Sequence, residues 1–287
     1  MPSRRRLIAL CLAAANAAAC AAEPLDESDG EVDPGVVLAV GLDTNGVSMN
    51  GVSMNGSQLV GVTADGATLS GSQLVGAKFT GQFSDGGTTP LRIDGARASG
   101  DVWFYQVSYP AASGHQPLCG VDATGAAREA IALAGRWDYR QGVAGGGSHI
   151  DEPSTFTFAC RAATLAKCVE LGYKPWASAG GVSLKNHHQA CTRMLRADYC
   201  GDGTSYTVNG TPINLYDNVG VQADTESWAI EAEWTPAGAR FVASATDTRL
   251  HLTQSTAPSC YTQRVSTGVG ALAHFSTGTL LMSEYKP

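Results

Sequence analysis

Glycine and apolar residues recur with a fixed period in the first part of the chain. From Gly41 to Gly86 a glycine occupies every fifth position. The third of the four residues between successive glycines is apolar, and the first is small or β-branched. The apolar positions are Met49, Met54, Leu59, Ala64, Leu69, Leu74 and Phe79. This regularity predicts a repeated structural unit over residues 41–88.

The fivefold period resembles that of pentapeptide-repeat proteins, whose right-handed β-helix turns a corner every five residues. The resemblance implies that the third residue of each unit points into the coil and that glycine relieves the corner. About eight such units make only two coils. We therefore expect a short β-helix that leans on a neighbouring domain. The alternative is a flexible glycine-rich linker.

Beyond residue 90 the pattern changes to short segments in which apolar and polar residues alternate, which predicts β-strands. The clearest of these segments are 101–109, 205–216 and 226–234. The middle segment contains Asn209-Gly210, a pair that favours a two-residue hairpin turn because both positions need positive φ. These features indicate an antiparallel sheet.

Two segments between the strands have helical spacing. The first lies within residues 155–171 and ends at Gly172. The second begins at Ser183 and carries one continuous face, formed by His187, Cys191, Met194, Leu195 and Asp198. Gly201 stands where a left-handed residue would stop this helix. The expected fold class of residues 90–287 is therefore α+β, with a helical hairpin packed on an antiparallel sheet.

The second helix ends in Ala197-Asp198-Tyr199-Cys200, with Cys191 nine residues before the last of these. The stretch resembles the ADYC domain, which is named after these four letters and occurs in myxobacterial and related bacterial proteins. The resemblance covers residues 90–287 and implies a cell-envelope domain of unknown function. It supplies no catalytic residue and no cofactor.

The first 40 residues have the composition of an export leader and a tether. Residues 1–19 combine three arginines, an apolar run and a small-residue cleavage site, which predicts a signal peptide. Cys20 follows three alanines and resembles the acylated cysteine of bacterial lipoproteins, although Ala17 stands where leucine is usual. An acylated Cys20 would hold the protein on a membrane surface. The alternative is plain secretion. Residues 20–40 contain six carboxylates and predict an acidic tether.

The charge of the chain limits its partners. The formal net charge is −7, and removal of the three leader arginines takes it to −10. A surface this acidic repels phosphate backbones, so nucleic acid is not an expected partner. The glycine-rich stretch 142–147 lacks the strand-then-helix context of a phosphate loop. We expect an extracellular or envelope ligand of unknown chemistry, and no cofactor.

Six of the eight cysteines lie beyond Cys20: Cys119, Cys160, Cys168, Cys191, Cys200 and Cys260. An even number in an exported chain predicts disulfides. Zinc is the alternative, but no pair has the CxxC spacing typical of structural zinc. Cys191 and Cys200 cannot pair on one helix, because nine helical steps span ~13 Å. Facing residues of an antiparallel helical hairpin have a constant sum of residue numbers. This rule predicts Cys168–Cys191 and Cys160–Cys200, and it leaves Cys119–Cys260 as the third bridge.

His187, His188 and Asp198 are the candidates for chemistry. A carboxylate on the inner face of a helix must be hydrogen-bonded or paired. One hypothesis makes Asp198 a general base, or the orienting partner of a histidine, in an extracellular hydrolase. The other makes it a buried structural group. Because no serine or cysteine nucleophile is positioned nearby, we expect a binding or structural module without a metal site.

Overall fold

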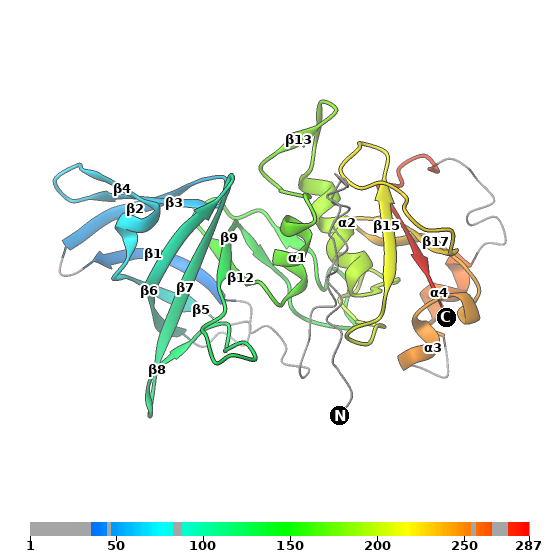
Figure 1. The fold of residues 1–287 in the computed structure, drawn as a ribbon, viewed down its shortest axis with the longest axis horizontal. Coiled ribbons are helices and arrows are strands. Elements are labelled where there is room, and N and C mark those ends of the chain that lie inside the picture. Colours follow the sequence, from blue (N-terminus) through cyan, green and yellow to red (C-terminus); the bar gives the residue numbers. More distant parts are fainter. Residues whose placement is uncertain (1–35, 45–46, 83–87, 254–256, 266–274, 287) are drawn as a thin grey trace, which may run out of the picture.

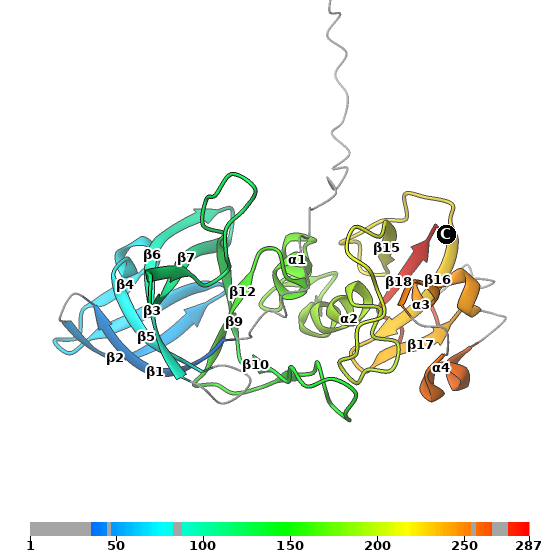
Figure 2. The same ribbon diagram turned by 90° about the horizontal axis from the view of Figure 1, so that it is seen from below.

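The computed structural model describes residues 36–44, 47–82, 88–253, 257–265 and 275–286. The predicted leader 1–19, Cys20 and the tether up to residue 35 lie outside these residues. Positions 36–40, assigned to the tether from the sequence, belong to a strand. Two large sheets stand at opposite ends of the molecule with two helices between them (Figures 1 and 2). Among the described residues, no helix is long and apolar enough to cross a membrane.

The N-terminal sheet contains ten strands, and every pairing in it is antiparallel. Its strands are β1 (Val36–Thr44), β2 (Val47–Asn55), β3 (Gln58–Thr63), β4 (Thr68–Ser70), β5 (Ala77–Gln82), β6 (Thr88–Ser99), β7 (Val102–Ala111), β8 (Gly114–Pro117), β9 (Ala130–Ala134) and β12 (Phe156–Cys160). The order is β12-β9-β7-β6-β5-β1-β2-β3-β4, with β8 beside β7 and a further pairing of β1 with β12. The coarse α+β class with antiparallel strands is therefore confirmed.

The described residues of 41–88 do not form the predicted β-helix. The repeat folds instead as hairpins, such as β2–β3, in which Met54 pairs with Leu59. Its predicted inward positions are correct in part. Leu59, Leu74 and Phe79 are buried in one core, and Met54 and Leu69 pack against it, whereas Ala64 is exposed. That core is completed by β6, β7, β9 and β12. Two coils could not enclose these side chains alone, whereas pairing with the following strands covers them.

The C-terminal sheet has four strands: β15 (Ile213–Asp217), β16 (Ala229–Thr235), β17 (Gly238–Val242) and β18 (Leu281–Tyr285), in the order β15-β18-β16-β17. Shorter elements complete the described fold: η1 (Gly71–Leu74), β10 (Arg136–Trp137), β11 (His149–Ile150), β13 (Ser178–Ala179), β14 (Val182–Ser183), η2 (Ala245–Asp247), α3 (Leu250–Thr253) and α4 (Ser259–Arg264).

The helical hairpin joins the two sheets. Helix α1 (Thr164–Glu170) contributes Leu165, Ala166 and Val169 to a core that also contains residues of β7, β9 and β12. Helix α2 (Lys185–Leu195) packs Ala190, Cys191 and Met194 against the C-terminal sheet. Figure 2 shows α1 on the side of the N-terminal sheet and α2 on the side of the C-terminal one. The helical hairpin therefore fixes the position of the two sheets relative to each other.

Helix α2 ends earlier than its apolar face suggests. The left-handed residue that ends the helix is Ala197, with φ 51°. Gly201, with φ 70°, is also left-handed but lies in the turn beyond. The amide of Asp198 donates to the carbonyl of Arg193, and the amide of Ala197 donates to that of Met194. These two bonds form a Schellman motif, which satisfies the last carbonyls of a helix. Asp198 and Tyr199 consequently lie in a turn after the helix, not on it.

Three disulfides are present: Cys119–Cys160, Cys168–Cys191 and Cys200–Cys260. The predicted Cys168–Cys191 bridge joins α1 to α2, with 5.9 Å between its Cα atoms. The predicted pairings Cys160–Cys200 and Cys119–Cys260 are wrong. Cys160 is the last residue of β12, and Cys200 lies beyond the turn at Ala197. Neither is helical, so the constant-sum rule does not apply to them.

Candidate functional site

Asp198 lies at the centre of a closed hydrogen-bonded turn. Its side chain is fully buried and forms an ion pair with Nη1 of the equally buried Arg193. Its Oδ1 accepts the amides of Gly201 at 2.8 Å and Asp202 at 3.1 Å, and its Oδ2 accepts that of Gly203 at 2.9 Å. Both oxygens are therefore saturated by the protein itself, as a buried carboxylate requires.

Arg193 also donates hydrogen bonds to two other loops and so connects them to the Asp198 turn. Its Nη1 donates to the carbonyl of Gly146 at 2.6 Å, its Nη2 to Oγ of Ser148 at 2.8 Å, and its Nε to the carbonyl of Pro236 at 3.1 Å. The glycine-rich loop lies against this turn so closely that a Cβ on Gly146 would be 2.2 Å from the carbonyl oxygen of Asp202. Close packing explains why glycine is required there.

Tyr199 belongs to a second buried network, on the face toward the C-terminal sheet. Its hydroxyl donates to Oε1 of Glu231 at 2.6 Å. Arg249 donates to both oxygens of Glu231 at 2.9 Å, and also to the carbonyl of Met194 at 2.7 Å. Burial by itself would raise the pKa of Glu231, but the charge of Arg249 lowers it below the usual value. Glu231 is therefore a paired carboxylate in the core.

The two histidines of α2 are buried and do not face solvent. The Nε2–H of His188 donates to the carbonyl of Leu165 at 3.0 Å, since a carbonyl can only accept. Burial lowers its pKa to about 4. His187 stacks on Tyr173 with 6.3 Å between the ring centroids, and burial lowers its pKa too. Both rings serve packing between α1, α2 and the adjoining segments.

The His188 environment gives a prediction about pH. An unfolded histidine titrates near 6.5, whereas the folded one titrates near 4. The unfolded chain therefore binds a proton that the folded chain lacks between these values, so stability falls as the pH falls through this window. Between pH 7 and pH 5 the loss attributable to His188 is about 2 kcal/mol.

A His188→Gln variant is expected to lose less stability over that interval than the wild type, by about 2 kcal/mol. Urea unfolding at both pH values measures the difference. A His115→Gln variant, altered at an exposed histidine, serves as the control and is expected to behave like wild type. Equal losses of stability in the wild type and in His188→Gln would contradict the conclusion that the His188 ring is buried and neutral in the folded protein.

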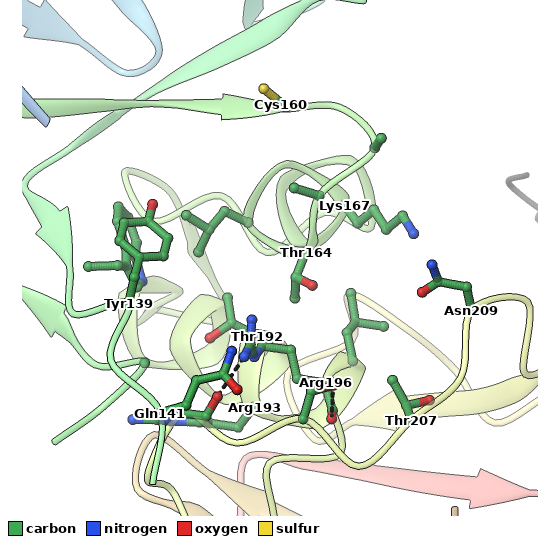
Figure 3. Close-up of a pocket in the computed structure, with 18 of the residues that line it drawn as sticks. Tyr139, Gln141, Cys160, Thr164, Lys167, Thr192, Arg193, Arg196, Thr207 and Asn209 are labelled. Atoms are coloured by element: carbon green, nitrogen blue, oxygen red, sulfur yellow. Dashed lines mark hydrogen bonds between the residues drawn. The ribbon is translucent and has the colours of Figure 1, made fainter. Parts of the chain in front are cut away.

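A concave site lies elsewhere, between the helical hairpin and two loops (Figure 3). This α1–α2 pocket has a volume of about 440 Å³. Its walls are the stretch after β10, the two helices, and the segment between α2 and β15. Residues that represent these walls are Tyr139, Gln141, Thr164, Lys167, Thr192, Arg193, Arg196, Thr207 and Asn209. His187, His188 and Asp198 are absent from the lining.

The pocket is strongly basic. Six of its described lining side chains are cationic, and one is a carboxylate: Arg128, Arg140, Lys167, Arg193, Arg196 and Arg249, against Asp138. The carboxylate is engaged by Arg140 at 2.6 Å. Arg193 and Arg249 have their own buried carboxylates. A basic hollow in a chain with a formal charge of −7 is a local concentration of positive charge.

Arg196 is the least satisfied of these cations. Its Nη2 donates to the carbonyl of Gly203 at 2.6 Å, but its buried Nε has no hydrogen-bond partner among the described residues. Burial lowers the pKa of its guanidinium, while the nearby charge of Asp198 opposes that shift. An unmet buried donor costs about 1–3 kcal/mol.

The sequence predicts no pocket at these residues. Its relevant signals are the turn pair Asn209-Gly210, the glycine-rich loop, and Cys119 and Cys160, all of which border the pocket. The cations come from separated parts of the chain, between residues 128 and 249, so no local spacing unites them. The zinc alternative is also excluded at the six cysteines beyond Cys20, because all six form disulfides.

One comparison with known proteins identifies a family. No curated protein and no solved structure matches the chain. The family model of the ADYC domain matches residues 71–248, from η1 in the glycine repeat to the residue before Arg249. The match therefore starts before residue 90 and spans both helices, the Asp198 turn and nearly all of the pocket. The chain belongs to the ADYC domain family.

Proposed function

We propose that this protein is an exported, lipid-anchored module of the cell envelope that binds a ligand in the α1–α2 pocket. The observation that carries the proposal is a pocket with covalently fixed walls. Cys119 and Cys160, which bond to each other, both line it, and Cys168–Cys191 joins the two helices. A prearranged site loses little entropy on binding, and this favours recognition.

The export part of the proposal rests on the leader pattern, Cys20 and the disulfides, which persist in oxidising compartments. In a bacterial host, the full chain is expected in the membrane fraction and to be extracted by detergent. A Cys20→Ser variant is expected in the soluble exported fraction. Identical fractionation of the two proteins would contradict lipid anchoring.

The binding part is tested with a panel of neutral and charged monosaccharides and amino acids, by thermal melting of the full chain. We expect at least one compound to raise the melting temperature saturably and to be recovered chemically unchanged. Thr164→Trp fills the pocket and is expected to abolish the shift, whereas Thr246→Trp, at an exposed position outside it, is expected to preserve it.

The competing hydrolase hypothesis uses His187 or His188 with Asp198. In the structure each of these side chains is buried, and none lines the pocket. Hydrolysis of a glycoside, a peptide or a phosphate ester by the wild type, lost in a folded His188→Gln protein, would support the hydrolase and overturn the module.

A further inference from the structure

We propose that the α1–α2 pocket binds a small hydroxylated anion, a compound with a carboxylate or phosphate group, and that Arg196 binds the charged group. This inference rests on the proposed function, because it names the ligand class of the same pocket. It follows from three features of the lining: its charge, the unsatisfied guanidinium, and the uncharged polar groups around it.

The charge of the lining favours an anion after existing pairs are taken into account. Arg140, Arg193 and Arg249 are each matched by a carboxylate. Arg128 and Arg196 make no ion pair with any carboxylate in the described ranges, and both line the pocket. A neutral ligand would leave this positive potential uncompensated, whereas a carboxylate or phosphate would neutralise it.

The geometry of Arg196 points to the position of the charged group. The guanidinium is held by its bond to the carbonyl of Gly203 and by the rigid turn after α2. In Figure 3 its side chain lies along the floor of the pocket, beside Thr192 and Arg193. Arginine presents its donors as a planar fork that matches carboxylate and phosphate oxygens. Nε itself is fully buried, so a ligand oxygen would bind the part of the half-buried Arg196 side chain that lines the pocket.

Uncharged polar side chains line other parts of the same walls. Thr164 on α1, Gln141 after β10 and Thr207 before β15 all line the pocket. Hydroxyl and amide groups both donate and accept, so they suit the hydroxyl groups of a ligand. The volume of about 440 Å³ lies within the range of small-molecule sites, roughly 300–1,000 Å³. The pocket thus fits a compound of monosaccharide size or somewhat larger.

Matched probes separate charge from shape. Glucose, glucuronate and glucose 6-phosphate share a sugar ring and differ in whether they carry a carboxylate, a phosphate or neither. Calorimetric titration of the full chain with each is expected to show saturable binding of at least one of the two anions. Glucose is expected to bind at least about tenfold more weakly, the loss typical of a charge-assisted hydrogen bond.

Three variants test whether the anion binds in the pocket. Arg196→Gln is expected to weaken binding of the anion at least about tenfold while the melting temperature without ligand stays close to that of wild type. Arg240→Gln removes one positive charge from an exposed position outside the pocket and is expected to change binding less than about twofold. Thr164→Trp, which fills the pocket, is expected to abolish binding.

The outcomes separate this inference from the proposed function. Equal binding of glucose and the anions, lost in Thr164→Trp, would overturn the anion preference and leave the binding module in place. Anion binding that is unchanged in Arg196→Gln would overturn the role of that residue. Absence of binding by all three probes would overturn the inference, and hydrolysis of a glycoside, a peptide or a phosphate ester would overturn the proposed function itself.

Discussion

Replacement of Asp198 by alanine is expected to lower the free energy of unfolding by about 3–5 kcal/mol. The variant leaves the guanidinium of Arg193 buried without its carboxylate, and it removes the acceptor for the amides of Gly201, Asp202 and Gly203. Uncompensated buried charge is among the few causes of so large a loss. Urea unfolding monitored by circular dichroism measures the change.

Asp202→Ala is the matched control, because it alters an aspartate of the same turn that is partly exposed and accepts only the amide of Thr204. Its expected cost is below about 1 kcal/mol. If the two variants lost similar, small amounts of stability, the Arg193–Asp198 pair would not be the structural centre of the turn.

Replacement of Glu231 by glutamine is expected to have an effect of similar size, about 3–5 kcal/mol. Glu231 is completely buried and receives hydrogen bonds from Tyr199, Arg249 and Ser283. Glutamine keeps the shape of the side chain, but it leaves the buried Arg249 without a counter-charge, and its amide group cannot accept at both ends. The free energy of unfolding from denaturant titration provides the test.

Glu226→Gln changes an exposed carboxylate a short distance along the chain and is expected to be nearly neutral. A Glu231→Gln protein as stable as Glu226→Gln would show that Tyr199 does not connect the Asp198 turn to the C-terminal sheet through a charged core network.

Local patterns predicted only part of the local structure, since the segment 205–216 is a strand only from Ile213 and does not form the expected hairpin at Asn209-Gly210. Cys191 and Met194 on α2 are buried, as are Ala232 and Trp234 in the strand predicted at 226–234. These features depend on side-chain periodicity, which the sequence displays directly. The alternation fails at Glu231 and Glu233 of that strand, which are buried as well. The structural role of Asp198 was also accessible, because a carboxylate on an inner helical face needs a partner, and Arg193 lies five residues earlier.

The pairing of strands and of cysteines that lie far apart along the chain could not be predicted from the sequence. A fivefold glycine period is compatible with a coil or with hairpins, and the choice depends on whether other strands cover the apolar side chains. Two of the disulfide predictions were wrong for a related reason. Cys160 and Cys200 were treated as helical, although the chain enters α1 only at Thr164 and leaves α2 at Leu195.

The pocket was not predictable from spacing. Arg128, Lys167, Arg196 and Arg249 come from four separate segments that the fold brings together. The chain as a whole has a negative net charge, so its composition does not indicate a basic site. Only the three-dimensional arrangement separates the cations that are already paired with carboxylates from Arg196, whose buried Nε has no partner in the described part of the chain.

The central claim is that the Asp198 turn holds the fold while the neighbouring pocket binds the ligand. Thermal melting of wild type, Asp198→Ala and Arg196→Gln, each with and without glucuronate and with and without glucose 6-phosphate, tests it most directly. We predict that Asp198→Ala melts at a lower temperature and keeps a reduced ligand-induced shift, because the turn that holds Arg196 is loosened, whereas Arg196→Gln melts like wild type and loses the shift. The opposite pattern, with stability kept and ligand response lost in Asp198→Ala, would contradict the account.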